Sequence, residues 1–295
     1  MPQKSSESIL TDYLVSTEWL AGHLHAESLR VVDIRGYVKA TDLGGGLQSA
    51  EYVGAKDEYD LGHIPNSSYI DWTTDIVDLT NHLKAQIAPP GAFADALASR
   101  GISNDSDVVI VDHAGGHFAT RLWWALGYYG HSRAAILDGG FNKWAAEGRI
   151  LTEVVPEFKQ GIFHPVTHPE IRVEADEVVA AIGKSGTIIV DARDAPTFTG
   201  EIRRHTRGGH VPFAVNIPAK SLVEADGTWK SVDQLAQILR SGGVTEDQHV
   251  IAYCNGGVTA TAVLFALART GHTNFSNYDG SWNEWGERPD LPVEP

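Results

Sequence analysis

Cysteine is nearly absent from this chain, which has one, Cys254, among its 295 residues. A lone cysteine cannot form an internal disulfide, and it offers no cluster of thiolates for a structural metal ion. The sequence also lacks an apolar run of membrane-spanning length, and residues 1–12 lack the basic and apolar stretches of a secretory signal. We therefore expect a protein of a reducing, cytoplasmic setting that has no membrane partner.

Positive charge is scarce relative to negative charge. Lysine and arginine number 23 against 38 aspartate and glutamate residues, which leaves a formal net charge of −15. Such a field repels polyphosphates, so nucleic acid is not an expected partner, and an anionic substrate must meet a local positive site. Few of the histidines have ligand spacing, and no Walker loop or dinucleotide fingerprint follows an expected strand, so no metal or other cofactor is expected.

An internal repeat organises the sequence. Two segments of the first half recur 141 residues later, and two further segments recur in the same order with loops of different length between them. Four matches in one order indicate a duplicated domain. The matched segments are 32–35 and 190–193, 62–65 and 209–212, 109–131 and 250–272, and 137–144 and 278–285.

The chain length and one proline-rich segment predict the domain boundaries. A length of 295 residues fits two domains, each large enough to bury its own core. Residues 151–172 contain Pro156, Pro165 and Pro169 and show no helical or strand periodicity, which is typical of a linker. We expect domains at 1–150 and 173–295.

Each copy alternates short β-rich runs with helical patterns, which predicts an α/β fold with a mainly parallel sheet flanked by helices. In the second copy Ser231 and Gln234 have the spacing of a capping box, which predicts the start of a helix that runs to Arg240. The segments expected in this copy are strands at 187–191, 214–217, 249–253 and 275–278, and helices at 231–240 and about 258–270.

Cys254 stands where chemistry is most favoured. It ends an expected strand, and Asn255, Gly256 and Gly257 separate it from the next helix. Consecutive glycines let successive N–H groups converge above a helix N-terminus, where they favour a thiolate and would hold an anionic outer sulfur. The alternative is a small buried hydrophobic residue, but that role does not require this strand, turn and helix.

These residues resemble the tandem rhodanese-like sulfurtransferases, which include thiosulfate and 3-mercaptopyruvate sulfurtransferases. The resemblance covers nearly the whole chain and depends on the order of its motifs more than on any one of them. The motifs are 190–193, 208–212, 214–218, 254–260 and 278–282, with companions at 62–65, 121–124 and 137–141 in the first copy.

The resemblance implies two tandem rhodanese-like domains and a ping-pong reaction through a cysteine persulfide. Cys254 would be the nucleophile, and Arg193 matches an arginine that faces the active-site loop and could orient an anionic donor. Asp191 matches an aspartate near the site. An ion pair near a strand end and a capped turn are the structural alternatives for these two residues. The loop whose amides would bind the donor and stabilise the anions consists of Asn255, Gly256, Gly257, Val258 and Thr259.

The first copy has no equivalent nucleophile. The 141-residue offset places His113 opposite Cys254 and Asp112 opposite Tyr253, and neither His113 nor Asp112 can carry a persulfide. We therefore expect a catalytically inactive first domain that packs against the active one and shapes its cleft, as in the family.

The resemblance makes thiosulfate the first expected donor and cyanide or a thiol the acceptor, with 3-mercaptopyruvate as the alternative donor. Thiosulfate-type loops usually carry basic residues after the cysteine, whereas this loop is uncharged, like the mercaptopyruvate type. A further family arginine is replaced by Thr197. Arg203, Arg204 and Arg207 in the next loop could compensate, or could form a solvated basic turn.

Two other classes of function compete with this interpretation. A cysteine phosphatase needs a longer loop that ends in arginine, and no arginine lies between Cys254 and the next helix. A non-catalytic persulfide carrier is harder to separate from an enzyme, because its cysteine would need the same surroundings.

Overall fold

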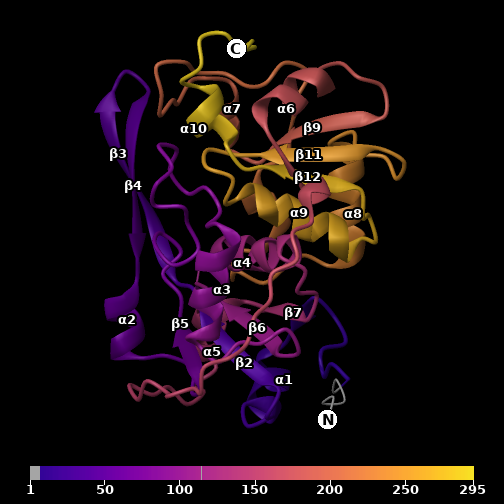
Figure 1. Ribbon diagram of the computed structural model, residues 1–295. Helices are drawn as coiled ribbons and strands as arrows, with labels where there is room; N and C mark the ends of the chain where they lie inside the picture. Colours follow the sequence, from indigo (N-terminus) through magenta and orange to yellow (C-terminus); the bar gives the residue numbers. More distant parts are fainter. Residues whose placement is uncertain (1–6, 114) are drawn as a thin grey trace.

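The computed structural model describes residues 7–113 and 115–295. Two α/β halves follow one another along the chain, and Figure 1 shows the first half below the second. Each half contains a five-stranded sheet in which every strand pair is parallel. The expected fold class, a parallel sheet flanked by helices in two tandem copies, is confirmed.

The sheet of the first half has the strand order β1-β7-β6-β2-β5. Its central strand β6 (Asp107–Val111) is buried along its whole length, as expected for a parallel strand covered on both faces. The other strands are β1 (Leu14–Val15), β2 (Leu29–Asp33), β5 (Ser67–Tyr69) and β7 (Ala134–Leu137). The helices are α1 (Thr17–His23), α2 (Lys56–Leu61), α3 (Pro90–Ala98), α4 (His117–Tyr128) and α5 (Gly140–Ala146).

The second sheet has the order β10-β9-β11-β12-β8, which is the same topology with each strand replaced by its repeat equivalent. Three strands have the expected bounds, whereas β10 is shorter than the expected 214–217. The strands are β8 (Arg172–Val173), β9 (Thr187–Asp191), β10 (Val215–Asn216), β11 (His249–Tyr253) and β12 (Phe275–Tyr278). The helices are α6 (Ala175–Ala181), α7 (Ala195–Phe198), α8 (Val232–Ser241), α9 (Ala260–Arg269) and α10 (Ser281–Trp285), with 3₁₀ turns η1 (Pro169–Ile171) and η2 (Ala219–Leu222).

The two helices expected in the second half are present. Ser231 caps α8, and Ser231 and Gln234 form both hydrogen bonds of the expected capping box. Helix α9 begins at Ala260, two residues later than expected, because Val258 and Thr259 belong to the loop that follows Cys254. Gly271 follows its C-cap with a φ of 84°, which glycine adopts without strain.

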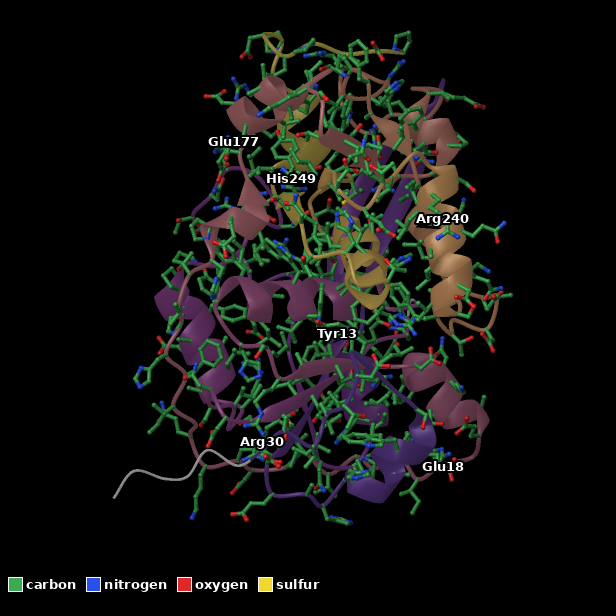
Figure 2. The ribbon with its side chains drawn as sticks, turned by 90° about the vertical axis from the view of Figure 1, so that its right-hand side faces the viewer. Tyr13, Glu18, Arg30, Glu177, Arg240 and His249 are labelled. Carbon is green, nitrogen blue, oxygen red and sulfur yellow. The ribbon has the colours of Figure 1, made fainter. Side chains whose placement is uncertain are left out.

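Helices α4 and α9 pack against each other between the two sheets, so one apolar core runs through both halves. Residues 260–267 of α9 are all buried, because this helix is covered by its own sheet on one side and by α4 on the other. Phe265 of α9 contacts the edge of Trp123 and lies 6.4 Å from Tyr13, which Figure 2 labels at the junction of the halves. The core therefore couples the halves.

A long β-hairpin leaves the first half and runs alongside the second (Figure 1). Its strands β3 (Gly36–Gly44) and β4 (Leu47–Gly54) pair antiparallel and form a separate two-stranded sheet. At its tip, Gln48 N–H donates to Arg203 O and Arg203 N–H donates to Gly46 O, both at 2.8 Å. The sequence analysis did not predict this hairpin, although alternating residues around Gly44-Gly45-Gly46 are a hairpin signal.

Within the expected linker, residues 151–168 form no helix or strand, whereas η1 and the start of β8 fall in its last four residues. None of the helices in the described part of the chain is long and apolar enough to cross a membrane.

Candidate active site

Cys254 follows β11 directly and is 2% exposed. Its N–H donates to Ser281 Oγ and its carbonyl accepts from Trp282 N–H, each at 3.1 Å. The start of α10 therefore holds the backbone of this cysteine from both sides. The expected succession of strand, cysteine, glycine-rich turn and helix is present.

The loop from Asn255 to Thr259 offers free backbone donors. In residues 7–113 and 115–295, no acceptor takes the N–H groups of residues 255–260. Gly257 has a φ of 71°, and a Cβ there would lie 2.7 Å from Asp279 O, so only glycine fits the turn. Unpaired amides above the start of α9 form a site that favours an anion.

In the equivalent loop of the first half, the backbone amides are already bound by the side chain of Asp112. The carboxylate of Asp112 accepts from the N–H groups of Gly116, Phe118 and Ala119 at 2.9 to 3.0 Å. The repeat offset relates these three amides to those of residues 257, 259 and 260, which have no carboxylate. An anion-binding loop thus exists in both halves, and it is open only beside Cys254.

A cavity of about 440 Å³ lies between the halves and reaches Cys254. Asn255, Gly256, Val258 and Thr259 form part of its wall. Four of the five loop residues predicted from the sequence therefore line one cavity. The fifth, Gly257, does not line it, and its carbonyl accepts hydrogen bonds from Arg121 and Asn277. The first half contributes Gly36, Tyr37, Tyr52, Trp72, His113 and His117.

Two histidines of the first half face this cavity. His113 Nδ1 and His117 Nε2 are buried, and neither has a hydrogen-bond partner in the described part of the chain. Burial lowers the pKa of both imidazoles, which keeps them neutral near pH 7. Asn255 Oδ1 is a third buried atom without a partner on the same wall. Unsatisfied polar atoms that gather in one cavity mark a place for a polar ligand.

The structure shows which of the three arginines at 203, 204 and 207 reaches the cavity. Arg204 lines the cavity and has no carboxylate partner within 4 Å among the described residues. Arg207 instead donates to the carbonyls of Arg288 and Leu291. Arg203 is exposed and pairs its backbone with the β3–β4 hairpin. Lys220 also lines the cavity, and its Nζ lies 2.7 Å from the carboxylate of Asp194.

Arg193 lines the cavity, but its guanidinium is held inside the protein. It donates to both oxygens of Asp191 and, at 2.7 Å, to Gly209 O. Burial alone would lower the pKa of Arg193, but the charge and hydrogen bonds of Asp191 and the neighbouring Tyr253 together raise it. In the first half Arg35 binds Asp33 and Gly62 O in the same way, although no cysteine is present there. Fixing a strand end accounts for both pairs.

The sequence analysis expected the first half to shape the cleft, but it named none of the side chains that do so. Tyr37 and Tyr52 lie on the hairpin strands, and the packing of the halves brings them to the cavity. It also missed Lys220, which lies on η2 of the second half. Within the described residues, no three His, Cys, Asp or Glu side chains gather closely enough to hold a metal ion.

Comparisons with known proteins agree with this geometry. The family model of the rhodanese-like domain matches residues 16–147 and 174–288. The 3-mercaptopyruvate sulfurtransferase of Escherichia coli K12 is 34% identical over 97% of this chain and 99% of its own length. A putative thiosulfate sulfurtransferase of Saccharopolyspora erythraea is 32% identical over 96% of each chain.

Solved structures show the same likeness. The crystal structure of SseA from Escherichia coli, described as a 3-mercaptopyruvate sulfotransferase, superposes with a TM-score of 0.79 at 32% identity. The superposition covers 92% of this chain and 99% of SseA. Yeast Tum1, with a TM-score of 0.80 at 22% identity, shares the fold. The chain is a sulfurtransferase and belongs to the rhodanese-like family, of which it carries two tandem domains.

Proposed function

We propose that Cys254 carries the transferred sulfur as a persulfide, with 3-mercaptopyruvate as the preferred donor and a thiol or cyanide as acceptor. The observation that carries the proposal is the loop of unpaired amides beside a buried cysteine at the end of a cavity. Thiosulfate, the first donor expected from the sequence, stays a candidate. The domain at 173–295 would be the catalytic one, and the domain at 1–150 its inactive partner.

The charges of the cavity favour a donor with one negative group. Arg204 is its unpaired cation, and the loop after Cys254 carries no charge. A single carboxylate can pair with Arg204 while the rest of 3-mercaptopyruvate meets neutral donors. Thiosulfate has two charges close together, which suit a loop with its own basic residues. The relatives include a 3-mercaptopyruvate sulfurtransferase and a putative thiosulfate sulfurtransferase. We therefore propose that the protein accepts both donors and reacts faster with 3-mercaptopyruvate.

The reaction proposed has two steps. The Cys254 thiolate attacks the outer sulfur of the donor, the bond from that sulfur to the donor breaks, and the electron pair leaves with pyruvate enolate or sulfite. The outer sulfur is then a persulfide anion, which the amides of residues 255–260 stabilise with dipoles already in place. A thiolate or cyanide attacks that sulfur, and the Cys254 thiolate is regenerated.

Two roles follow for the arginines. Arg204 would orient the carboxylate of the donor. Arg193, proposed from the sequence as that cation, would act through its ion pair with Asp191, which fixes the strand end that borders the cavity. A donor-binding role for Arg193 itself predicts that Arg193→Lys raises KM at unchanged stability. A structural role predicts lower stability instead.

Intact-protein mass spectrometry tests the persulfide directly. The reduced protein is incubated with 3-mercaptopyruvate or thiosulfate and then with cyanide. We expect a gain of one sulfur that cyanide removes, faster with 3-mercaptopyruvate, and no gain in Cys254→Ser, which keeps the fold. Loading of the serine variant would refute the role of Cys254. Loading only by a cysteine desulfurase would instead identify a persulfide carrier.

A further inference from the structure

The hairpin strand β4 places one hydroxyl group of the first half against the loop that follows Cys254. A Cβ built on Gly256 would lie 2.9 Å from Tyr52 Oη, so the loop and the tyrosine are in direct contact. Tyr52 lines the same cavity as Cys254. Burial raises the pKa of Tyr52, with a smaller contribution from Cys254. Tyr52 therefore keeps its proton at neutral pH.

A hydrogen bond from α10 and an aromatic ring of the first half hold Tyr52 in place. Asn283 Nδ2 donates to Tyr52 Oη at 3.4 Å, and the Tyr52 ring packs on Trp72 with the ring centres 5.2 Å apart. The amide of Asn283 is oriented by His205, whose Nε2 lies 3.2 Å from Asn283 Oδ1. The main chain of Asn283 donates to Asn255 O at 2.7 Å. The tyrosine is thus tied to the catalytic loop through α10.

The proton of this hydroxyl has no acceptor among residues 7–113 and 115–295. Asn283 supplies a donor to Tyr52 Oη, and no carbonyl, carboxylate or other acceptor of the described chain takes the Tyr52 O–H. Tyr52 is partly buried and lines the cavity, so its O–H is available to a ligand there. The hydroxyl is neutral, so it can donate to an anion without adding charge to the cavity.

We propose that Tyr52 discriminates between sulfur donors by donating its hydroxyl proton, as a hydrogen bond, to the oxygen at C2 of 3-mercaptopyruvate. The inference rests on the proposed function of the site. When the Cys254 thiolate attacks the donor sulfur, the C3–S bond breaks and its electron pair forms the enolate of pyruvate, with negative charge on the C2 oxygen. The sulfur keeps its proton until the persulfide ionises, and the enolate takes a proton from water at C3.

The hydroxyl serves the two donors differently. The C2 oxygen of 3-mercaptopyruvate is neutral before the C–S bond breaks and charged afterwards, so the hydrogen bond strengthens in the transition state and accelerates the step. The oxygens of thiosulfate carry charge before and after sulfite leaves. A hydrogen bond to the thiosulfate oxygens stabilises the bound donor and the transition state to a similar degree. Such a bond changes KM but leaves the maximal rate unchanged.

Single-turnover persulfide formation, followed by rapid quench and mass spectrometry, tests the proposal with both donors in the full chain. For Tyr52→Phe we expect a loss on the order of 10²-fold in the loading rate with 3-mercaptopyruvate. With thiosulfate the maximal rate should stay within about threefold of wild type. Tyr13→Phe is the control, since this partly exposed tyrosine lies at the junction of the halves and outside the cavity.

A second variant separates the hydroxyl from the contact that orients it. Asn283→Ala removes the hydrogen bond to Tyr52 Oη but leaves the hydroxyl, so we expect a smaller loss with 3-mercaptopyruvate than in Tyr52→Phe. Equal losses with both donors in Tyr52→Phe, no loss with either, or a larger loss with 3-mercaptopyruvate in Asn283→Ala than in Tyr52→Phe would overturn the proposal. If the wild-type protein is loaded by thiosulfate and never by 3-mercaptopyruvate, the donor assignment fails first, and the role of Tyr52 falls with it.

Discussion

Thr120 and Thr261 hydrogen-bond to each other through their side-chain hydroxyls, with the two Oγ1 atoms 2.9 Å apart. The two residues occupy the same position of the repeat, 141 residues apart, on α4 and α9. Equivalent residues that touch must lie on the axis that relates the copies. The interface between the halves is therefore self-complementary, and it is buried at this point because both threonines are fully buried.

Removing this hydroxyl pair should reveal coupling between the halves. Thr261 also donates to Val258 O at 2.6 Å. Thr261→Val removes both of these hydrogen bonds, while Val258 O keeps the one from Thr261 N–H and the Thr120 hydroxyl keeps the one to His117 O. We expect Thr261→Val to lower the free energy of unfolding by about 0.5 to 1.5 kcal/mol. Thr120→Val combined with Thr261→Val should cost less than the sum of the single variants, measured by urea unfolding. Strict additivity would contradict a direct interaction.

Arg121 of the first half places a buried charge against the loop that follows Cys254. It binds Asp279 Oδ1 at 2.6 Å and donates to Gly257 O at 3.1 Å, and the pair is almost fully buried. Arg121→Met should lower stability by up to about 3 to 5 kcal/mol, because the buried carboxylate of Asp279 loses its nearest cation and keeps only Arg172, whose Nε lies 3.6 Å away. Asp279→Leu added to Arg121→Met should restore part of that stability. The measurement is the denaturant midpoint, and no rescue would argue against the charge as the cause.

A cysteine placed in the first half should not make a second active site. In His113→Cys combined with Cys254→Ser, a persulfide at residue 113 would need the amides that the carboxylate of Asp112 already occupies. We expect no gain of sulfur from either donor by mass spectrometry. Loading at residue 113 would contradict the proposal that an occupied anion site keeps the first half inactive.

Gly257→Ala should damage the site through contact as well as backbone strain. Gly271 has a similar left-handed φ, 84° against 71°, but a Cβ there meets nothing within 4 Å. Gly271→Ala measures the backbone cost alone, about 1 to 2 kcal/mol. Gly257→Ala adds a clash with Asp279 O at 2.7 Å, so we expect a larger loss of stability and a fall in the persulfide loading rate. Equal effects of the two variants would contradict the clash.

Buried histidines should make the protein less stable in mild acid. Burial lowers the pKa of the His131 imidazole, which is 2% exposed. Below the usual histidine pKa of about 6.5 the unfolded chain binds protons that the folded chain does not, so the free energy of unfolding falls as pH falls through that window. Histidines with the same shift and cause are His113, His117 and His249.

His131→Gln should flatten this pH dependence between about pH 7.5 and 5.5, because one of the groups that titrate in that window is removed. His164→Gln is the matched control, since this side chain is exposed and has no resolved hydrogen bond in the described chain. The unfolding midpoint is measured at each pH. An unchanged slope in His131→Gln would show that acid destabilisation comes from other groups.

The order of motifs was enough to predict the tandem α/β architecture, and the position of the one cysteine at the end of a strand. Strands such as β9 and β11 are short and apolar between turn residues, and the capping box at Ser231 marks its helix, because these signals act between neighbours in the chain. Gly256 and Gly257 after Cys254 likewise predict a turn of converging amides. Local sequence therefore determined where the cysteine stands and what its loop can bind.

Only the tertiary structure decided which side chains share the cavity with Cys254. The sequence suggested Arg193 as a donor-binding cation and did not decide whether Arg203, Arg204 or Arg207 reaches the site. In the structure Arg193 forms a buried ion pair with Asp191, whereas Arg204 lines the cavity. Tyr52 reaches the same wall from a hairpin about 200 residues earlier in the chain. Such contacts depend on how two halves pack, and no periodicity within either half encodes the partner that a side chain meets.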